Sequence, residues 1–306
     1  MSTFDPDALE CLAAIVEEGG FERAAQRLSI TQSAVSQRLR ALESQVGTVL
    51  IVRSRPLKTT SAGQLLLKHT KQMRLLRADL ERDLKELAPS SIGGARDEER
   101  VSIAINADSI ATWAMDAVGD LMRQGLPLEI IADDQDFTQE WLRQGQVLGC
   151  VTTLKQALRG CKVQPLGGME YIAVCSSDGP SGTQLDVRTG LTAHNFRNVP
   201  FIAFNRKDDM QTEFVAKAFG LKRVTLNQVF VPSSEAQVRA VLAGWGVSVV
   251  PALIVQPLID AGRLVNIAPW HHLHVQLYWH CWNLESDVLD SLTAALIEAA
   301  AQQLHR

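Results

Sequence analysis

A short stretch near the N-terminus carries the kinds of side chain that read DNA bases. Residues 23–43 spell RAAQRLSITQSAVSQRLRALE, and a helix starting after Thr31 would turn one polar face outward. The candidate contact residues on and beside that face are Thr31, Gln32, Ser33, Ser36, Gln37, Arg38 and Arg40. Glutamine can pair bidentately with adenine and arginine with guanine, while serine suits base edges or phosphate. The pattern favours a DNA recognition helix over the alternative, an ordinary amphipathic helix with a polar outer face.

Two short helices and a tight turn are predicted to position that face. Thr31 is a good N-cap for the second helix, because its hydroxyl can accept a hydrogen bond from a first-turn amide. Small Ala25 would let the two helices approach closely, and Val35 would fill the space beneath. The apolar positions of the pair are Ala24, Ala25 and Leu28, then Ala34, Val35, Leu39 and Leu42. This spacing predicts a helix-turn-helix.

A basic hairpin is predicted directly after these helices. The sequence GTVLIVRSRPLKTTSAG, which starts at Gly47, contains a short β-prone run, a proline turn and a return strand. Arg53, Arg55 and Lys58 flank the turn, where they can contact backbone phosphate or the minor groove. Such a wing completes a winged helix-turn-helix DNA-binding domain, which we place over residues 1–60.

Charge is distributed unevenly along this chain of 306 residues, whose formal net charge is −4. Residues 1–22 hold six acids and no base, whereas residues 23–77 hold eleven bases and one acid, Glu43. The basic segment suits a polyanionic partner, although a solvated basic face would give the same count. The five cysteines form no CxxC pair, and the N-terminus has no apolar signal core, so we expect a cytoplasmic protein with free thiols. No apolar run is long enough to span a membrane.

One long helix is predicted over residues 61–88. Apolar residues recur there at seven-residue steps, with a second set three residues later, in an imperfect heptad pattern. We assign the seam to Leu66, Met73, Leu76, Leu80 and Leu87. Because such a helix is longer than one wing needs, we expect it to pair two copies of the chain and to set two recognition helices on a dyad DNA site. The alternative is a helix that packs on its own chain.

The rest of the chain has the pattern of an α/β protein. Residues 89–100 have the composition of a hinge, and residues 101–306 alternate strand and helix patterns. Alternating βα units predict a doubly wound sheet, in which ligands bind at strand ends and helix starts. The predicted fold class is therefore α/β multidomain, with a winged helix-turn-helix, a long linker helix and a C-terminal α/β domain.

The segment GGFERAAQRLSITQSAVSQRLRALESQVGTVLIVR resembles the N-terminus of LysR-type transcriptional regulators. AGWGVSVVP (243–251) is similar to the glycine-rich strand entry of their effector domain. More narrowly, FERAAQ, ITQSAVSQR, INADSIATW (105–113) and SSEAQV (233–238) resemble the subgroup that senses lysine and arginine and controls export of basic amino acids. One departure is Ser29, which stands where many helix-turn-helix proteins have glycine.

The resemblance implies an effector-binding domain of two subdomains joined by two crossover strands, as in periplasmic binding proteins. Subdomain I would comprise about 101–171 and 277–306, subdomain II about 172–276, and the crossovers would fall near 171–175 and 277–281. The resemblance further implies a dimerising linker helix, a homodimer or homotetramer, double-stranded DNA as a partner, and lysine or arginine as effector in the cleft. Effector binding would change the DNA bend and the access of RNA polymerase.

Candidate effector residues follow from the chemistry of a cationic amino acid. Helix starts at Ser109 and Ser233 can receive its carboxylate, and aspartates after strands can receive its cationic end. The resemblance also points to Ser109, where family members often have a ligand-contacting serine or threonine. The candidates are Asp108, Ser109, Thr112, Asp133, Asp134, Thr152, Asp208, Asp209, Ser233, Ser234 and Glu235. Each aspartate has the alternative role of a turn or cap residue.

Other functions have weaker support. The histidines lack the carboxylate or thiolate partners of a settled metal site, so we predict no metal and no cofactor; they are His271, His272, His274 and His280. Neither a GxSxG elbow nor a GxxxxGK[ST] loop is present, and we therefore predict no catalytic residues and no enzyme activity. Two alternatives stay open: a regulator with a different small-molecule effector, and an architectural DNA-binding protein that needs none.

Overall fold

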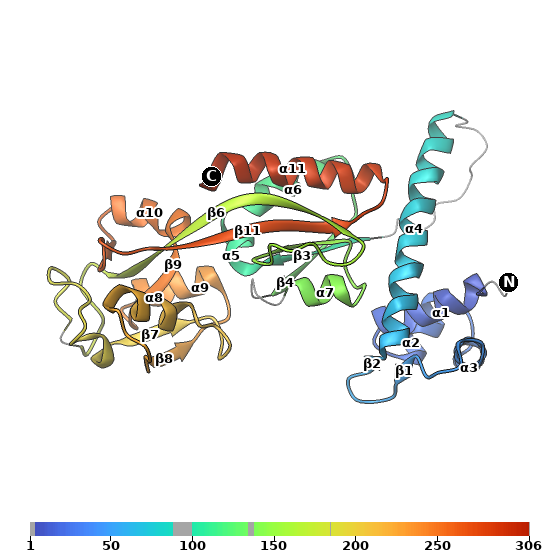
Figure 1. The fold of residues 1–306 in the computed structure, drawn as a ribbon, viewed down its shortest axis with the longest axis horizontal. Coiled ribbons are helices and arrows are strands. Elements are labelled where there is room, and N and C mark those ends of the chain that lie inside the picture. Colours follow the sequence, from blue (N-terminus) through green and yellow to red (C-terminus); the bar gives the residue numbers. More distant parts are fainter. Residues whose placement is uncertain (1–3, 88–99, 134–137, 184, 306) are drawn as a thin grey trace.

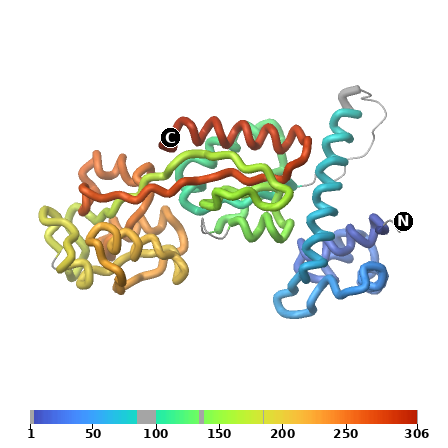
Figure 2. The backbone as a smooth tube through the Cα atoms, in the orientation of Figure 1, coloured from blue at the N-terminus to red at the C-terminus, as the bar shows by residue number. Residues whose placement is uncertain are grey.

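The computed structural model describes residues 4–87, 100–133, 138–183 and 185–305 (Figures 1 and 2). A small N-terminal unit surrounds the lower end of one long helix, α4 (Ser61–Leu87), and an elongated α/β unit lies beside that helix (Figure 1). Most of the predicted hinge, 89–100, falls outside the described residues. None of the described helices combines the length and apolar character needed to cross a bilayer.

The N-terminal unit is a helix-turn-helix with a two-stranded wing, as predicted. Its elements are α1 (Pro6–Glu17), α2 (Phe21–Arg27), α3 (Gln32–Val46), β1 (Ile51–Val52) and β2 (Lys58–Thr59). The predicted N-cap is present, because Thr31 Oγ1 accepts a hydrogen bond from the Ala34 amide at 3.1 Å. Val35 and the two alanines of α2 are buried, so the helices cross closely where small side chains allow it.

Helix α1 was not among the elements predicted from the sequence. It begins at Pro6, which suits a first helical turn, and Asp5 Oδ1 accepts a hydrogen bond from the Asp7 amide at 3.1 Å. Leu12 and Ile15 of α1 are fully buried in the core beneath α2 and α3. This helix therefore supplies much of the apolar support for α3.

The turn between α2 and α3 requires a left-handed backbone. Ser29 has φ of 53°, and no other non-glycine residue of the described chain has a positive φ. Glycine adopts this conformation freely, whereas a residue with a Cβ is disfavoured by roughly 1–2 kcal/mol. The departure from glycine seen in the sequence thus coincides with a strained position.

Helix α4 begins against the wing. The Thr60 hydroxyl accepts a hydrogen bond from the Gly63 amide at 3.1 Å and donates to the Val49 carbonyl at 2.8 Å. A Cβ at Gly63 would lie 2.2 Å from the Leu50 carbonyl oxygen. Because only glycine permits this approach, the start of α4 is fixed against the N-terminal unit.

One face of α4 packs inward and the opposite face carries exposed apolar side chains. Leu67 and Leu75 are buried, and Leu66, a predicted seam residue, packs against the N-terminal core. The exposed side chains form the linker stripe, which consists of Leu65, Met73, Leu76, Leu80 and Leu84. The side chain of Leu87, also predicted in the seam, lies outside the described atoms. The structure thus leaves most of the predicted seam uncovered in a single chain.

The inner face of α4 also contacts the α/β unit. Lys71 Nζ donates to the Gln146 carbonyl at 2.8 Å, and Lys68 Nζ donates to the Arg159 carbonyl at 3.4 Å. A Cβ at Gly145 would lie 2.7 Å from the Cβ of Lys68. The helix is therefore docked closely on the loops beside α7 (Thr138–Arg143) and β5 (Gly149–Thr152).

Subdomain I is built from βα units, as the alternating pattern predicted. Its elements are β3 (Val101–Asn106), α5 (Ala107–Ser109), η1 (Ile110–Ala114), α6 (Met115–Arg123), β4 (Leu128–Asp133), α7, β5 and α11 (Asp287–Gln303). β3 pairs in parallel with both β4 and β5. Helices α6 and α11 cover one face of the sheet and α7 lies on the other (Figure 1).

Two long strands run through both subdomains. β6 (Cys161–Ser176) and β11 (Leu273–Trp282) pair antiparallel. With β9 (Ser248–Pro251) and β10 (Leu264–Asn266) of subdomain II, the sheet order is β10-β6-β11-β5-β3-β4, and β9 also pairs with β6. Residues 171–174 of β6, where the first crossover is predicted, pair with β9 of subdomain II. Residues 278–281 of β11 instead pair with β5 in the sheet of subdomain I, so the second crossover precedes its predicted place at 277–281.

Subdomain II completes the domain with a second small sheet. Its elements are η2 (Phe196–Asn198), β7 (Pro200–Ala203), α8 (Met210–Phe219), β8 (Asn227–Phe230), α9 (Ser234–Leu242), β9 (Ser248–Pro251), α10 (Ala252–Asp260) and β10 (Leu264–Asn266). β7 pairs in parallel with β8, and α8 and α10 were not predicted. The five cysteines are free thiols, as expected.

Candidate functional site

The outward face of α3 is open to solvent. Gln32, Ser33, Gln37 and Arg40 are exposed and Ser36 is half-buried. They lie on the side of the helix opposite its buried row. A row of donors and acceptors on one exposed helix face is the arrangement that a major-groove reader needs.

Two of the predicted contact residues make bonds inside the N-terminal unit. Thr31 caps α3, and Arg38 Nη2 lies 3.1 Å from Oδ2 of Asp7 on α1. Arg38 is on the flank of α3 between its exposed face and its buried row. It therefore braces α1 against α3, beside the candidate DNA-binding face.

The wing presents basic side chains next to α3. β1 and β2 pair antiparallel, and Arg53, Arg55 and Lys58 on and between them are exposed. The Arg53 guanidinium lies over the Phe21 ring, with its Cζ 4.9 Å from the ring centroid. This contact holds the side chain at the start of α2, on the same unit as the exposed face of α3.

Part of the basic charge is neutralised within the protein. Arg74 of α4 forms ion pairs with Glu10 and Glu17 of α1, and Arg27 pairs with Glu17 as well. Burial alone would raise the pKa of Glu17, but the charges of Arg74, Lys71 and Arg27 outweigh it and hold that pKa below its usual range. The bases of the wing and Arg40 of α3 form no ion pair among the described residues, so their charge faces solvent.

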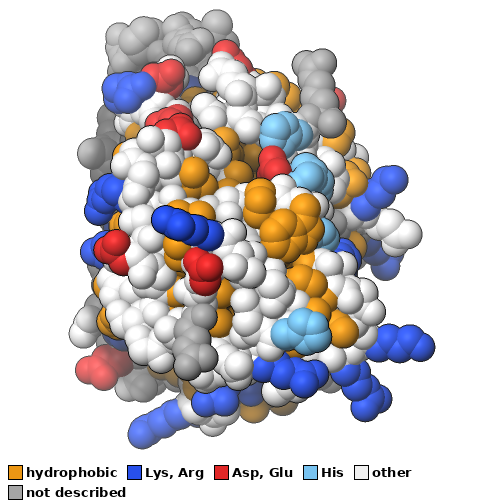
Figure 3. Space-filling view, turned by 90° about the vertical axis from the view of Figure 1, so that its left-hand side faces the viewer, with side chains coloured by type: hydrophobic (Ala, Val, Ile, Leu, Met, Phe, Trp, Pro, Cys, Tyr) orange, Lys and Arg blue, Asp and Glu red, His pale blue; other side chains and the backbone are white. Residues whose placement is uncertain are grey.

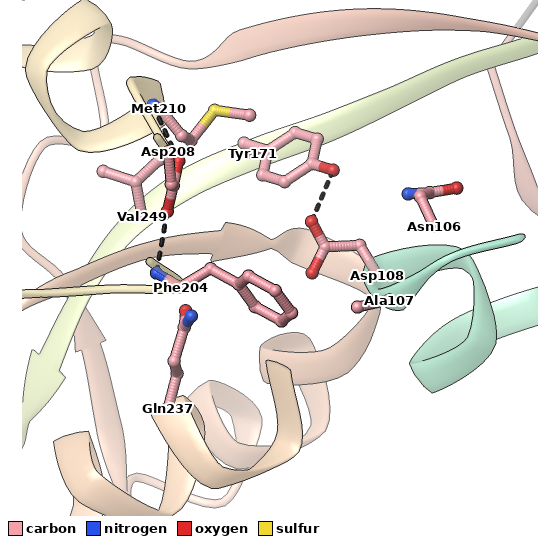
Figure 4. Close-up of a pocket in the computed structure, with 9 residues that line it drawn as sticks. All are labelled: Asn106, Ala107, Asp108, Tyr171, Phe204, Asp208, Met210, Gln237 and Val249. Carbon is pink, nitrogen blue, oxygen red and sulfur yellow. Dashed lines mark hydrogen bonds between the residues drawn. The ribbon is translucent and has the colours of Figure 1, made fainter. Parts of the chain in front are cut away.

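A small cavity lies between the two subdomains (Figure 4). Its volume is about 40 Å³. Its lining residues are Asn106, Ala107, Asp108, Tyr171, Phe204, Asp208, Met210, Gln237 and Val249. The first three follow one another at the carboxyl end of β3, Tyr171 belongs to β6, and the others come from subdomain II. The carboxyl ends of parallel strands are where open α/β sheets bind ligands.

Asp108 joins the two subdomains across this cavity. Its Oδ2 accepts a hydrogen bond from the Tyr171 hydroxyl at 2.8 Å, and its Oδ1 accepts one from the Ser234 hydroxyl at 2.5 Å. Burial raises the pKa of Asp108, because desolvation of the charged form outweighs these two hydrogen bonds, and the charge of Asp208 adds to the effect. A cation in the cavity would favour the ionised form.

Asp208 supplies the second carboxyl group. Its Oδ2 accepts from the Phe204 amide at 2.8 Å, and its Oδ1 accepts from the Met210 amide at 2.9 Å. These bonds fix the turn that leads into α8 and hold the carboxyl group at the cavity wall. No lysine, arginine or histidine is among the lining residues of the described chain. The cavity is therefore acidic.

The structure brings three of the predicted effector residues together. Asp108 and Asp208 line the cavity, and Ser234 reaches it through Asp108. Asp134 lies outside the described residues. The predicted residues that do not line this cavity are Ser109, Thr112, Asp133, Thr152, Asp209, Ser233 and Glu235.

Three of the residues that do not line the cavity have hydroxyls engaged elsewhere in the chain. Ser109 is fully buried and accepts a hydrogen bond from Trp113 Nε1 at 3.1 Å. Thr112 donates to a carbonyl one helical turn earlier at 2.7 Å, and Thr152 donates to Gln139 Oε1 at 2.9 Å. Their hydroxyls are thus bonded to other groups of the chain and do not face the cavity.

The other four lie nearer the surface. Asp133 accepts from Trp141 Nε1 at 2.8 Å and lines a separate hollow with Lys207. Ser233 caps α9, because its hydroxyl accepts a hydrogen bond from the Ala236 amide. Asp209 at the start of α8 and Glu235 at the start of α9 are exposed.

Residues missed from the sequence complete the cavity. Asn106 has a local signal, since it is a polar residue that ends a buried strand directly after the apolar run Ile103–Ile105. Tyr171 and Gln237 have none, because each sits within a strand or helix whose pattern is that of ordinary core. Only the convergence of β3, β6 and α9 in three dimensions brings them together.

Two of the four histidines, His271 and His280, lie apart from each other, whereas His272 and His274 are neighbours whose ring centroids are 4.6 Å apart. His280 is buried with Nε2 2.6 Å from the Leu154 carbonyl, and His271 packs edge-on against Phe214. His272 and His305 each lie 3.5 Å from the same carboxyl group, that of Glu170, and histidine side chains at this end of the protein are visible in Figure 3. Within the described ranges, no group of three or more His, Cys, Asp or Glu residues has a geometry that could hold a metal ion.

Two family models match the chain in succession. Residues 6–64 match the bacterial regulatory helix-turn-helix protein, lysR family, and residues 94–304 match the LysR substrate binding domain. The HTH-type transcriptional regulator ArgP of Aeromonas salmonicida is 38% identical over 305 residues, which cover 99% of each chain.

Solved structures of two related regulators have the same architecture along their whole length. ArgP from Mycobacterium tuberculosis superposes with a TM-score of 0.83 at 37% identity, covering 100% of this chain and 99% of that one. Full-length LysG from Corynebacterium glutamicum with bound effector Arg has a TM-score of 0.73 at 32% identity, covering 99% and 100%. The two domain matches and these full-length relatives agree with the winged helix-turn-helix, linker helix and two-subdomain architecture, and the chain belongs to the LysR family of bacterial transcriptional regulators.

Proposed function

We propose that this regulator senses lysine or arginine in the cavity between its two effector subdomains. The observation that carries the proposal is the pair of carboxyl groups, Asp108 and Asp208, at a cavity with no basic residue in its described lining. Desolvation disfavours the charged form of the Asp108 carboxyl group, so a cationic ligand beside it would be stabilised there. The related LysG with bound effector Arg supports the same ligand class.

Binding requires the contacts around Asp108 to change. A cavity of about 40 Å³ is far below the roughly 300 Å³ of a small-molecule site. An entering amino acid therefore displaces part of the lining, and the Ser234–Asp108 hydrogen bond joins the two subdomains at that point. A ligand that replaces this bond alters how the subdomains close on each other, and its differential affinity for the two arrangements is what shifts the regulator.

The same proposal assigns DNA binding to the N-terminal unit. The exposed face of α3 reads bases with Gln32, Ser33, Gln37 and Arg40, and the basic residues of the wing contact phosphate. Two copies pair through the exposed linker stripe of α4, which places two recognition helices on a dyad site. Higher assembly to a tetramer, control of RNA polymerase access and a cytoplasmic location complete the proposal, by analogy with the family.

Calorimetry on the full-length chain tests the effector. Lysine or arginine is expected to bind with a Kd on the order of micromolar, about −8 kcal/mol. Norleucine lacks the terminal ammonium and would leave the carboxyl groups without a partner, so its affinity is expected to be about 10²-fold lower. Equal binding of all three amino acids would contradict the charge argument, and absence of binding would remove the basic amino acid from the proposal.

A matched pair of variants ties binding to the cavity. Asp208→Asn neutralises a cavity carboxyl group, whereas Asp209→Asn neutralises the adjacent exposed one, which does not line the cavity. We expect the first to weaken arginine binding and the second to leave it unchanged. Equal effects of the two substitutions would place the ligand elsewhere.

A further inference from the structure

Asn106 is a buried amide with no hydrogen-bond partner. Its side chain is 1% exposed, lines the cavity and lies beside Asp108 (Figure 4). Within the described part of the chain, neither Oδ1 nor Nδ2 of Asn106 has a hydrogen-bond partner. Buried polar side-chain atoms have a hydrogen-bond partner in the large majority of cases. An amide whose oxygen and nitrogen both lack one is therefore suited to bind a partner from outside the chain.

Another buried amide of the same domain shows the contrast. Gln211 is also 1% exposed, but its Nε2 donates to the Val249 carbonyl at 3.0 Å and its Oε1 accepts from the Val249 amide at 2.7 Å. Gln211 therefore has a structural role that Asn106 lacks. An apolar residue at position 106 would suit the end of the buried strand β3 at least as well, because it would leave no polar atom unpaired.

The cavity also needs a hydrogen-bond donor if it is to hold an amino acid. Its other side-chain donors are engaged, since the Tyr171 hydroxyl donates to Asp108 and Gln237 Nε2 donates to the Val231 carbonyl at 3.1 Å. A ligand carboxylate that enters between the Asp108 and Asp208 carboxyl groups meets repulsion from both. Among the described lining residues, Asn106 Nδ2 is the side-chain donor with no bond to give up.

We infer that Asn106 binds the main-chain end of the effector, with Nδ2 donating to its carboxylate and Oδ1 accepting from its ammonium group. This inference rests on the proposed function, in which the cavity binds a basic amino acid. Asp108 and Asp208 then bind the cationic side chain of the ligand, and Asn106 makes the site selective for an amino acid over a simple amine. Both amide atoms gain a partner in the complex, which explains their isolation in the free protein.

A comparison of ligands with and without the carboxylate tests this role. Calorimetry on the full-length chain compares arginine with agmatine, which is arginine without its carboxylate, and lysine with cadaverine. In the unmodified protein, the amino acid is expected to bind about 10–100-fold more tightly than its amine, as for a hydrogen bond to a charged group. In Asn106→Leu, the amino acid loses that advantage while the amine keeps its affinity within about threefold.

Asn106→Asp gives a second, opposite signature. The carboxyl group has nearly the shape of the amide but offers no N–H and adds negative charge. Asn106→Asp is expected to weaken arginine binding by more than Asn106→Leu does. Agmatine, a dication, is expected to bind at least as tightly as before. The inference would be overturned if both variants reduced the affinities for arginine and agmatine to the same extent, or if they reduced neither affinity.

Thermal unfolding without ligand separates this role from a structural one. Asn106→Leu removes an unpaired buried amide, so its Tm is expected to stay the same or to rise by a few degrees, whereas Gln211→Leu breaks two bonds and should lower it. A Tm for Asn106→Leu as low as that of Gln211→Leu would overturn the inference whatever the ligand. If the unmodified protein binds other amino acids but not lysine or arginine, the proposed effector class is wrong. The role of Asn106 is then tested by comparing those amino acids with the amines that lack their carboxylate. If the unmodified protein binds no amino acid at all, both the proposed effector class and the role of Asn106 fail.

Discussion

Asp108→Asn is expected to weaken arginine binding by about 10²–10³-fold without unfolding the protein. Asparagine keeps the shape of the side chain, so the cavity lining stays in place, but the negative charge opposite the guanidinium is gone. Removing one partner of a buried, hydrogen-bonded charge pair costs about 2–5 kcal/mol, and each 1.4 kcal/mol is a tenfold change in affinity. The expected loss therefore lies well outside the error of a titration.

The free protein should change little in stability. The carboxylate of Asp108 accepts hydrogen bonds from both Tyr171 and Ser234, and asparagine has one oxygen to accept them, so one bond worth about 1 kcal/mol is lost. Relief from burying a charged group acts in the opposite direction, since burial raises the pKa of Asp108. A small net change would show that the binding loss is not a folding defect.

The same residue sets the pH dependence of binding. The pKa of Asp108 is raised in the free protein, and a bound cation favours the carboxylate and lowers it again. Binding therefore releases a proton near and below the raised pKa, and affinity falls as the pH drops through it. Titrations in two buffers of different ionisation enthalpy measure that proton. Unchanged arginine affinity in Asp108→Asn, or the same pH profile with and without the carboxyl group, would refute the assignment.

Other predictions concern the N-terminal unit and the linker helix. Gln32→Ala should cost about 1–3 kcal/mol on the cognate site and little on random DNA, whereas Lys58→Ala should weaken both alike and reduce the salt slope by about one, as measured by fluorescence anisotropy; equal losses on both DNAs for Gln32→Ala would exclude base readout. Leu80→Asp puts a charge into the linker stripe, and sedimentation at micromolar protein should show loss of a dimer contact together with weaker operator binding; unchanged mass would mean that this stripe is not an interface. Ser29→Gly relieves a left-handed backbone and should stabilise the unit against urea by up to about 1 kcal/mol, the greater flexibility of glycine in the unfolded chain offsetting part of the gain; destabilisation would show that the serine side chain has another task.

The elements that depend on local chemistry could be predicted from the sequence. The Thr31 cap, the alanines at the crossing of α2 and α3 and the hairpin all follow from residues close together in the chain. The alternation of strands and helices likewise gave the α/β fold class. The sequence also gave two aspartates that the structure places at the cavity, because acids after strands are natural ligand groups.

The rest depends on long-range packing. Arg38 lies beside the candidate DNA-binding face of α3 but pairs with Asp7, which belongs to α1, a helix that was not predicted from the sequence. Ser109 has the right type and position for a ligand contact, yet its hydroxyl is turned to Trp113 by the rotation of its helix. Tyr171 reaches the cavity through the register of β6, in which it pairs with Pro251 of β9 and Leu273 of β11, 80 and 102 residues later in the chain. No local pattern encodes that register.

The central claim is that a basic amino acid in the cavity changes how this regulator holds DNA. DNase I footprinting of the full-length chain on its dyad site, with and without arginine, tests it most directly. Arginine is expected to change the length of the protected region or its hypersensitive positions in the unmodified protein and in Asp209→Asn, but not in Asp108→Asn at the same ligand concentration. Identical footprints with and without arginine, under conditions where calorimetry shows the ligand bound, would contradict the account.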